Sequence, residues 1–183
     1  MPTAPDPLLD AAHALLAAEG ERALTARRLA GAIGASTKVI YSRHGGMKGV
    51  RRGLHTRGFA LLHAQMEQAM RGTRGGARLR AAVVAYRAFA ASEPALFGLM
   101  YGDAASRDLP ERADREAAAP TLDLLATAFS ATDPYAEARL FWSQMHGVTA
   151  LEVSGWLDAG EAHAFLIQVT ERFGVSAGKA ISS

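Results

Sequence analysis

The chain has 183 residues, of which 49% are hydrophobic, with a formal net charge of +2 and no cysteine. This composition excludes general disorder, disulfide bonds and thiolate metal sites, and the length allows one or two domains with a substantial core. Asp6 and Asp10 lie where a signal peptide would be apolar, and no window holds the roughly 20 apolar residues that cross a bilayer. We therefore expect a cytoplasmic protein without membrane association.

The first part of the chain predicts three helices. Residues 7–19 form one helix, because Pro7 suits a first helical turn and apolar residues follow at helical spacing. Residues 25–47, TARRLAGAIGASTKVIYSRHGGM, predict two shorter helices, with Thr25 and Ser36 able to cap them and Gly34 suited to the turn between them. Two helices joined by a short turn are the pattern of a DNA-binding helix-turn-helix, whose second helix enters the major groove.

The charge distribution supports the same interpretation. Residues 1–57 contain nine Lys/Arg and four Asp/Glu, a net charge of +5, whereas the rest of the chain carries −3. No acidic residue occurs between Glu21 and Glu67. A basic surface without interspersed acids is what binding to a DNA duplex requires. An ordinary helical hairpin with a solvated basic face is the alternative, but pattern and charge coincide at one place and favour DNA.

Residues 8–47 also carry the features of a known family. The first helix ends at Gly20, Ile40-Tyr41 stands for a Leu-Tyr pair, and Arg43-His44-Gly45-Gly46-Met47 stands for a His-Phe-Gly-Ser-Lys-like turn. On these residues the stretch resembles the N-terminal domain of the tetracycline-repressor (TetR) family of bacterial transcriptional regulators. The resemblance implies a three-helix DNA-binding domain in which the first helix supports the other two.

The predicted DNA contacts lie at the starts of the two helices and on one face of the second. Thr37, Lys38 and Tyr41 occupy that face, while Thr25 and Arg27 begin the preceding helix, whose dipole favours phosphate. The resemblance implies that Tyr41 binds a backbone phosphate, and it extends this role to two further residues. The full predicted set is Thr25, Arg27, Ser36, Thr37, Lys38, Tyr41, His44 and Lys48.

A long helix from Lys48 to Met70 leads to the segment RGTRGGARLR, residues 71–80, which we interpret as a linker because it is rich in arginine and glycine. This gives a DNA-binding domain at residues 1–57, and a regulatory and dimerisation domain at residues 71–183. Further helices are expected, and no segment alternates with period two, so the predicted fold class is all-α. The expected helices are residues 79–92, 95–101, 111–129 (broken, kinked or restarted at Pro120), 134–157 and 160–173.

The C-terminal part resembles a regulatory domain found in one branch of the same family and nicknamed for its Trp-His-Gly residues. Here these are Trp142 and His146-Gly147, preceded by EPALFGLMY at residues 93–101. The resemblance implies a regulator, and the family implies a repressor that a small, mainly apolar effector releases from DNA. The candidate effector-binding residues, most of which could equally be core, are Phe89, Phe97, Met100, Tyr101, Phe129, Phe141, Trp142, Met145 and His146.

The last two helices are expected to form a homodimer. From Leu140 to Leu157 the only fully charged residue is Glu152, and apolar residues occur all around the predicted helix. A helix that is apolar on every side must be buried on every side, and a second copy could cover what one small domain cannot. Two-fold symmetry would also suit a palindromic operator in double-stranded DNA.

Catalysis is not expected. The sequence lacks His-Glu-x-x-His and Gly-x-Gly-x-x-Gly patterns and has no acidic cluster suited to a metal, so no enzyme activity, cofactor or metal is predicted. Two alternatives stay open beside the ligand-responsive repressor. One is a DNA-binding regulator without a small-molecule ligand; the other, less favoured, is a basic helical protein at an acidic membrane surface.

Overall fold

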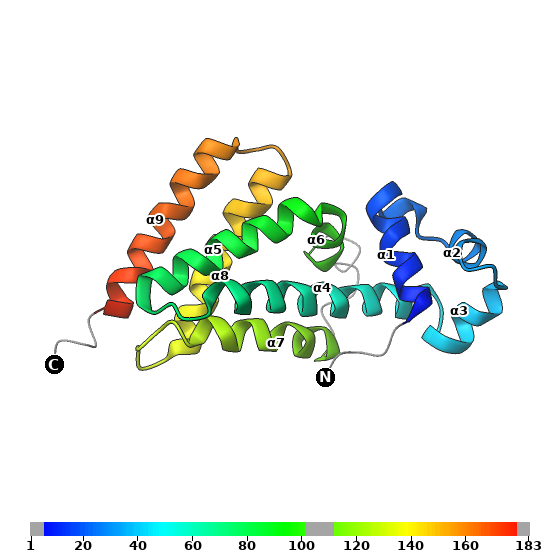
Figure 1. Ribbon diagram of the computed structural model, residues 1–183, viewed down its shortest axis with the longest axis horizontal. Coiled ribbons are helices and arrows are strands. Elements are labelled where there is room, and N and C mark those ends of the chain that lie inside the picture. Colours follow the sequence, from blue (N-terminus) through cyan, green and yellow to red (C-terminus); the bar gives the residue numbers. More distant parts are fainter. Residues whose placement is uncertain (1–5, 102–111, 179–183) are drawn as a thin grey trace. The chain divides into compact units, whose positions relative to one another are not determined.

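The computed structural model describes residues 6–101 and 112–178. Within these residues the secondary structure is entirely helical, which confirms the all-α fold class (Figure 1). The elements in chain order are α1 (Pro7–Glu19), the 3-10 helix η1 (Glu21–Ala23), α2 (Ala26–Ala32), α3 (Thr37–His44), α4 (Met47–Met70), α5 (Gly75–Ser92), α6 (Pro94–Tyr101), α7 (Arg112–Ala126), α8 (Pro134–Val153) and α9 (Ala159–Gly178).

The helix-turn-helix forms as the local sequence predicts, with one difference. Thr25 caps α2, its Oγ1 accepting a hydrogen bond from the Arg28 backbone N–H, and Gly34 adopts a positive φ of +62° in the turn. Ser36 occupies the N-cap position of α3, but its side chain makes no capping hydrogen bond. The Val39 N–H, which a capping hydroxyl would use, bonds instead to the backbone carbonyl of Ser36 at 3.1 Å.

The first compact unit comprises residues 1–59 and 93–117. Its core contains residues from the helices that precede and follow the turn, together with the first half of α4: Leu8, Leu16, Leu29, Ile40, Val50 and Leu54. Helix α6 packs against α1 in this unit, and His13 Nε2 lies 2.9 Å from Glu93 Oε2, just before α6. Packing therefore groups α6 with the helix-turn-helix, while the functional division at residues 1–57 and 71–183 stays a prediction.

The second compact unit comprises residues 60–92 and 118–183, in which α5 packs along α9 and both pack against α8. Helices α5 and α9 approach closely where two glycines meet, because a Cβ added to Gly174 would lie 3.5 Å from the Gly76 Cα. Three phenylalanine rings fill the neighbouring core with edge-to-face contacts at centroid distances of 5.4 to 6.1 Å: Phe129, Phe141 and Phe173.

Several boundaries differ from the sequence-based expectation. Helix α7 runs through Pro120 as one helix and ends at Ala126, and α8 ends at Val153. The predicted linker at residues 71–80 is wrong in its second half, because α5 already begins at Gly75. Arg78 stabilises this early start: its Nη1 donates to the Met70 carbonyl at 2.8 Å and its Nε to Thr127 Oγ1 at 3.0 Å. Helix α9 also continues past Phe173 to Gly178.

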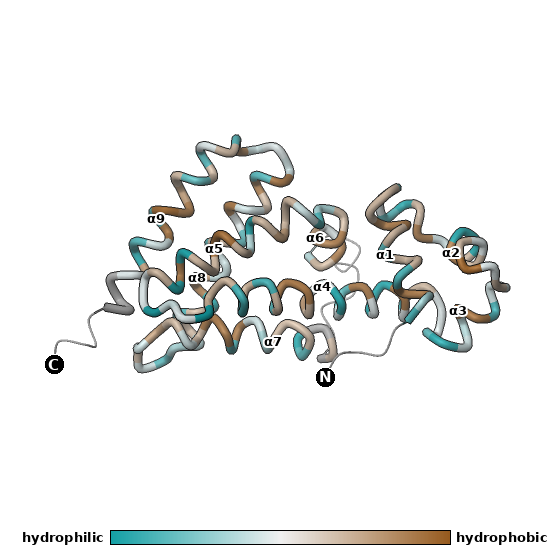
Figure 2. The backbone as a smooth tube through the Cα atoms, in the orientation of Figure 1, coloured by the Kyte–Doolittle hydropathy of each residue, from teal (hydrophilic) through white to brown (hydrophobic). Residues whose placement is uncertain are grey.

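Hydrophobic and hydrophilic residues alternate along the helices, as amphipathic packing requires (Figure 2). The hydrophobic residues include most of those that are buried in the two units. None of the helices in the described part of the chain combines the length and hydropathy of a bilayer-spanning helix.

Candidate nucleic-acid interface and ligand-binding residues

Most of the predicted DNA contacts are exposed side chains on the helix-turn-helix. Tyr41 is the clearest, since 62% of this large aromatic residue is open to solvent in the middle of α3. Gly46, with φ +97°, leaves room for the Tyr41 ring, because an added Cβ would lie 3.2 Å from it. The other exposed members of the predicted set are Thr25, Arg27, Ser36, Thr37, Lys38 and Lys48.

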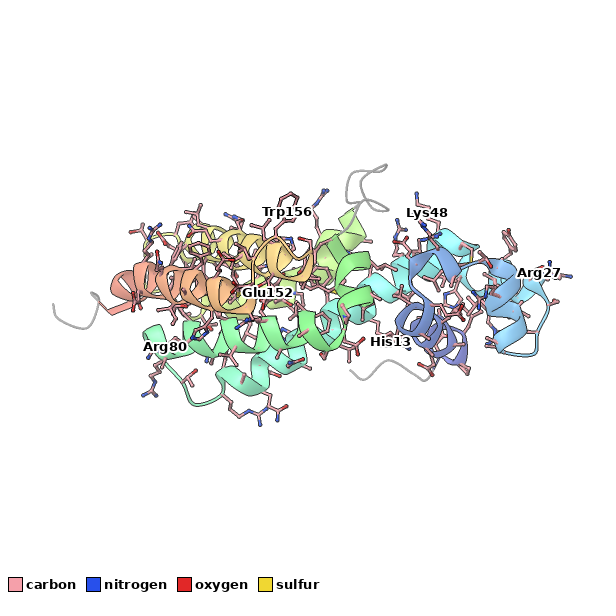
Figure 3. The ribbon with its side chains drawn as sticks, turned by 90° about the horizontal axis from the view of Figure 1, so that it is seen from above. His13, Arg27, Lys48, Arg80, Glu152 and Trp156 are labelled. Atoms are coloured by element: carbon pink, nitrogen blue, oxygen red, sulfur yellow. The ribbon has the colours of Figure 1, made fainter. Side chains whose placement is uncertain are left out.

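Two cations of the first unit that Figure 3 labels extend outward, and several of its arginines form ion pairs with acidic residues. Arg27 and Lys48 extend away from the ribbon (Figure 3). Other arginines in this unit form ion pairs with acids that lie earlier in the chain, so their charge is largely compensated. These pairs are Arg28 with Glu19 at 2.5 Å, Arg51 with Glu21 at 3.2 Å and Arg57 with Asp10 at 2.7 Å.

His44 differs from the other predicted contacts. Only 14% of its side chain is exposed, and its Nε2 lies 3.2 Å from Asp6 Oδ2. Asp6 also caps α1, where Oδ1 accepts from the backbone N–H of Leu8 at 3.1 Å. His44 therefore joins the end of α3 to the start of α1, and its phosphate contact stays a prediction. Sequence reasoning missed this because the two residues lie far apart in the chain.

The nine candidate effector residues do not lie in one compact unit. Three of them, Phe97, Met100 and Tyr101, belong to α6 in the first unit. The other six belong to the second unit, on α5, on α8 and between α7 and α8: Phe89, Phe129, Phe141, Trp142, Met145 and His146. No local pattern indicates this division, because α6 follows α5 directly in the chain.

In the first unit, the α6 residues pack against the first half of α4. The Tyr101 ring meets Phe59 edge to face at 5.6 Å and lies 5.0 Å from Phe97. Helices α4 and α6 are in tight contact at Gly58, where an added Cβ would lie 2.4 Å from Met100 Sδ. Sequence reasoning did not include Phe59 among the aromatic residues of this group. Its burial on α4 against Tyr101 is seen only in the structure.

In the second unit, His146 forms a polar pair with a residue that the sequence did not single out. Its Nδ1 lies 2.8 Å from the hydroxyl oxygen of Tyr86, which is fully buried on α5. Burial lowers the pKa of His146 below its ordinary value of 6.5, so the ring is neutral at pH 7. The half-buried Trp142 ring lies one helical turn away, at a centroid distance of 6.2 Å.

Two charged side chains lie close to this pair. Arg87, which follows Tyr86 on α5, binds Glu152 on α8 through Nε at 2.7 Å and also donates through Nη2 to the Ala159 carbonyl at 3.0 Å. The ion pair raises the pKa of Arg87, mainly through the hydrogen bonds with Glu152. Among the described residues, no group of three or more His, Asp or Glu side chains is arranged to hold a metal ion.

Comparison with known proteins decides the family. The family model of the tetracyclin repressor-like C-terminal domain matches residues 79–172, which is half of the chain. The chain belongs to the TetR family of transcriptional regulators. Regulators of this family bind DNA, dimerise and are not enzymes, so this TetR-family chain is a DNA-binding regulator and not an enzyme.

Solved structures show the same fold at low sequence identity. A protein of unknown function from a Rhodococcus species is 23% identical with a TM-score of 0.77, covering 96% of this chain and 97% of that one. The TetR-family regulator PfmR from Thermus thermophilus is 20% identical with a TM-score of 0.60, covering 91% and 98%. The fatty acid degradation regulator FadR from Bacillus halodurans is 15% identical with a TM-score of 0.66, covering 91% and 96%. No curated protein matches the chain.

Proposed function

We propose that this TetR-family protein is a homodimeric transcriptional repressor that a small hydrophobic effector releases from a palindromic operator. The observation that carries the DNA-binding part is the exposed face of α3, on which Lys38 and the unusually exposed Tyr41 lie after the start of the helix. A cation and a hydroxyl group in this position suit base edges and backbone phosphates of the major groove. Thr25, Arg27 and Lys48 flank this face as further phosphate contacts.

The exposed apolar residues of α8 and α9 support dimerisation. Leu140 and Leu151 on α8 are separated by about three helical turns, a spacing that brings them to one face of the helix, and both are exposed. Gly147 lies on the same face, with nothing within 4 Å of an added Cβ, so a partner helix could approach closely there. Phe165 and Ile167 on α9 are exposed as well. Water-exposed apolar residues grouped on two adjacent helices suit a second copy of the chain.

The effector part of the proposal rests on the aromatic residues of the second unit with their polar pair, Tyr86 and His146. An effector releases DNA only if it binds more tightly to the arrangement that does not bind DNA. Because such coupling is reciprocal, operator DNA must weaken effector binding by the same factor. A regulator without a small-molecule ligand is the competing function, and it predicts that no compound alters operator affinity.

Operator binding tests the proposal at Lys38 and Tyr41. The operator is first isolated by selecting bound fragments from random DNA, and affinity is then measured across a range of salt concentrations. Lys38→Ala should weaken binding, and it should lower the slope of log K against log salt by about 0.9 because one contact of a cation with phosphate is lost. Tyr41→Phe should weaken binding through loss of one hydroxyl contact.

The matched control is Arg80→Ala, which removes one exposed cation from α5 in the second unit. It should leave both the operator affinity and the salt slope unchanged. If Lys38→Ala and Tyr41→Phe behave like this control, the exposed face of α3 does not bind DNA. If no fragment is selected at all, the proposed DNA-binding function is wrong.

A further inference from the structure

A buried hydroxyl on α8 points to the chemistry of the effector. Thr149 is fully buried, and its Oγ1 has no hydrogen-bond partner among the described residues. Buried polar groups in proteins are nearly always hydrogen-bonded, because leaving one unpaired costs free energy. An unpaired buried hydroxyl therefore suggests that a partner comes from outside the chain.

Two other threonines are buried: the Thr121 hydroxyl likewise has no partner among the described residues, whereas Thr170 shows how a helix can satisfy such a group. Thr170 on α9 is also buried, but its Oγ1 donates to the Leu166 carbonyl one turn earlier at 2.8 Å. This backward bond within the helix satisfies a buried hydroxyl without any other group. Thr149 does not make the corresponding bond, so its Oγ1 keeps the capacity to bind another oxygen or nitrogen.

Helical geometry places Thr149 with the aromatic and polar residues described above. Trp142, His146 and Thr149 follow at i, i+4 and i+7, so they share one face of α8. Tyr86 on α5 meets this face through its hydrogen bond to His146. Trp142 and His146 are partly exposed whereas Thr149 is not, so the face leads from the surface into the core. We call the three α8 residues Trp142, His146 and Thr149, together with Tyr86 of α5 that contacts His146, the α8 face.

The charges near the α8 face favour a neutral ligand. Partial burial lowers the pKa of His146 below 6.5, so its ring is neutral at pH 7. Glu152 lies one turn beyond Thr149 on α8, and Arg87 lies on α5. These two side chains bind each other and so compensate each other's charge. The described part of this face therefore presents hydroxyl, imidazole and indole groups, and a carboxylate brought to it would lose its hydration without gaining a counter-ion.

We propose that the α8 face binds an uncharged aromatic molecule that packs on Trp142 and accepts a hydrogen bond from the Thr149 hydroxyl through a carbonyl oxygen. This inference rests on the proposed function, in which a small hydrophobic molecule is the effector, and it adds the ligand's charge, ring and hydrogen-bonding group. Aromatic packing supplies most of the affinity, and the hydrogen bond supplies orientation and selectivity.

Three naphthalene derivatives of nearly equal shape test the proposal by isothermal titration calorimetry on the full-length protein. They are 2-acetylnaphthalene, which is neutral with a carbonyl, 2-naphthoate, which is an anion, and 2-isopropylnaphthalene, which is neutral without a polar group. We expect 2-acetylnaphthalene to bind about tenfold more tightly than 2-isopropylnaphthalene, the effect of one buried hydrogen bond, and 2-naphthoate to bind least. Trp142 fluorescence in a Trp156→Phe background should report the same order.

The variants locate the hydrogen bond. Thr149→Val keeps the side-chain shape and removes the hydroxyl, so the preference for 2-acetylnaphthalene over 2-isopropylnaphthalene should disappear. Thr170→Val makes the same change at a buried threonine that already has a partner, and the preference should persist there. This pair separates loss of the hydroxyl from general destabilisation by Thr→Val.

Three outcomes would overturn the inference: no saturable binding of 2-acetylnaphthalene, binding of 2-naphthoate as tight as that of the ketone, or an unchanged preference in Thr149→Val. An unchanged preference would mean that Thr149 is satisfied without the ligand, for example by a buried water molecule. The titrations contain no DNA, so their failure leaves operator binding intact, whereas failure to select an operator would refute the proposed function alone.

Discussion

At the scale of single residues, Gly49 is the described glycine with the least room for a side chain. A Cβ added to Gly49 would lie 1.6 Å from the backbone carbonyl oxygen of His44, a group that cannot move without disturbing the end of α3. We expect Gly49→Ala to destabilise the protein by about 3 kcal/mol or more, at the upper end of overpacking effects. Urea denaturation followed by circular dichroism measures this change.

Gly98→Ala is the control for that prediction. Gly98 is exposed in the middle of α6, with nothing within 4 Å of an added Cβ. Alanine should stabilise this helix by about 0.5 to 1 kcal/mol, because glycine loses more conformational freedom on folding. Equal effects of the two substitutions would show that His44 and Gly49 are not as close as described.

The second prediction at this scale concerns His146 and acid. Burial lowers the pKa of His146 below 6.5, its ordinary value, so in the pH range just below 6.5 the unfolded chain binds more protons than the folded protein. Folding stability should therefore fall as the pH decreases through this range. His146→Gln keeps a side chain that can hydrogen-bond to Tyr86 but does not titrate, so the variant should lose less stability on acidification from about pH 7.5 to about pH 5.5. Denaturation midpoints at both pH values test this, and identical losses would contradict it.

At the scale of elements, α6 is expected to support the helices of the DNA-binding motif. Leu96 is buried on α6, and its Cγ would lie 3.3 Å from a Cβ added to Gly58 of α4. Leu96→Ala should cost about 3 kcal/mol and lower the hydrogen-exchange protection of α1 amides, because a cavity opens in the first unit. Leu61→Ala, on the exposed part of α4, should cost less than about 1 kcal/mol. Unchanged exchange in α1 would refute the support role of α6.

The elements themselves were largely readable from the sequence, and their grouping was not. Capping by Thr25 and Asp133, and the glycine turn at Gly34, are local, so residues within a few positions determine them. The pairs His13 with Glu93 and Tyr86 with His146 join residues 80 and 60 positions apart, and no local pattern marks them. The arginine-rich segment after α4 misled for a related reason, since Arg78 finds its partners, the Met70 carbonyl and Thr127, only once the end of α4 and the residue after α7 are placed.

At the scale of the whole molecule, dimerisation through the exposed apolar residues of α8 and α9 can be tested by substituting charged residues for them. Leu140→Lys combined with Leu151→Lys places two cations on the exposed apolar face of α8, where Leu140 is 57% exposed in the single chain. A buried charge without a partner is costly, so we expect dimerisation to weaken at least about 100-fold. Multi-angle light scattering at micromolar concentration should then find monomer.

Val84→Lys is the control, because Val84 on α5 is 68% exposed and lies outside the proposed dimer face. It should leave the dimer intact. A wild-type monomer at micromolar concentration would exclude the homodimer altogether, and an equal loss in Val84→Lys would move the interface to α5. Affinity for a palindromic operator should fall together with dimerisation, because each copy contributes one α3 helix.

The discontinuous first unit has a consequence for synthesis on the ribosome. The chain leaves this unit after residue 59 and returns to it at residue 93, so α6 is made after the whole of α5. Because translation runs from the N-terminus, the nascent chain contains α1 to α4 well before the helix that packs against α1 exists. A nascent chain ending at Ser92 would carry the complete helix-turn-helix but leave the α1 surface that receives α6 open to water. The time needed to translate residues 60–101 is therefore a period in which this surface of α1 is open to chaperones and proteases.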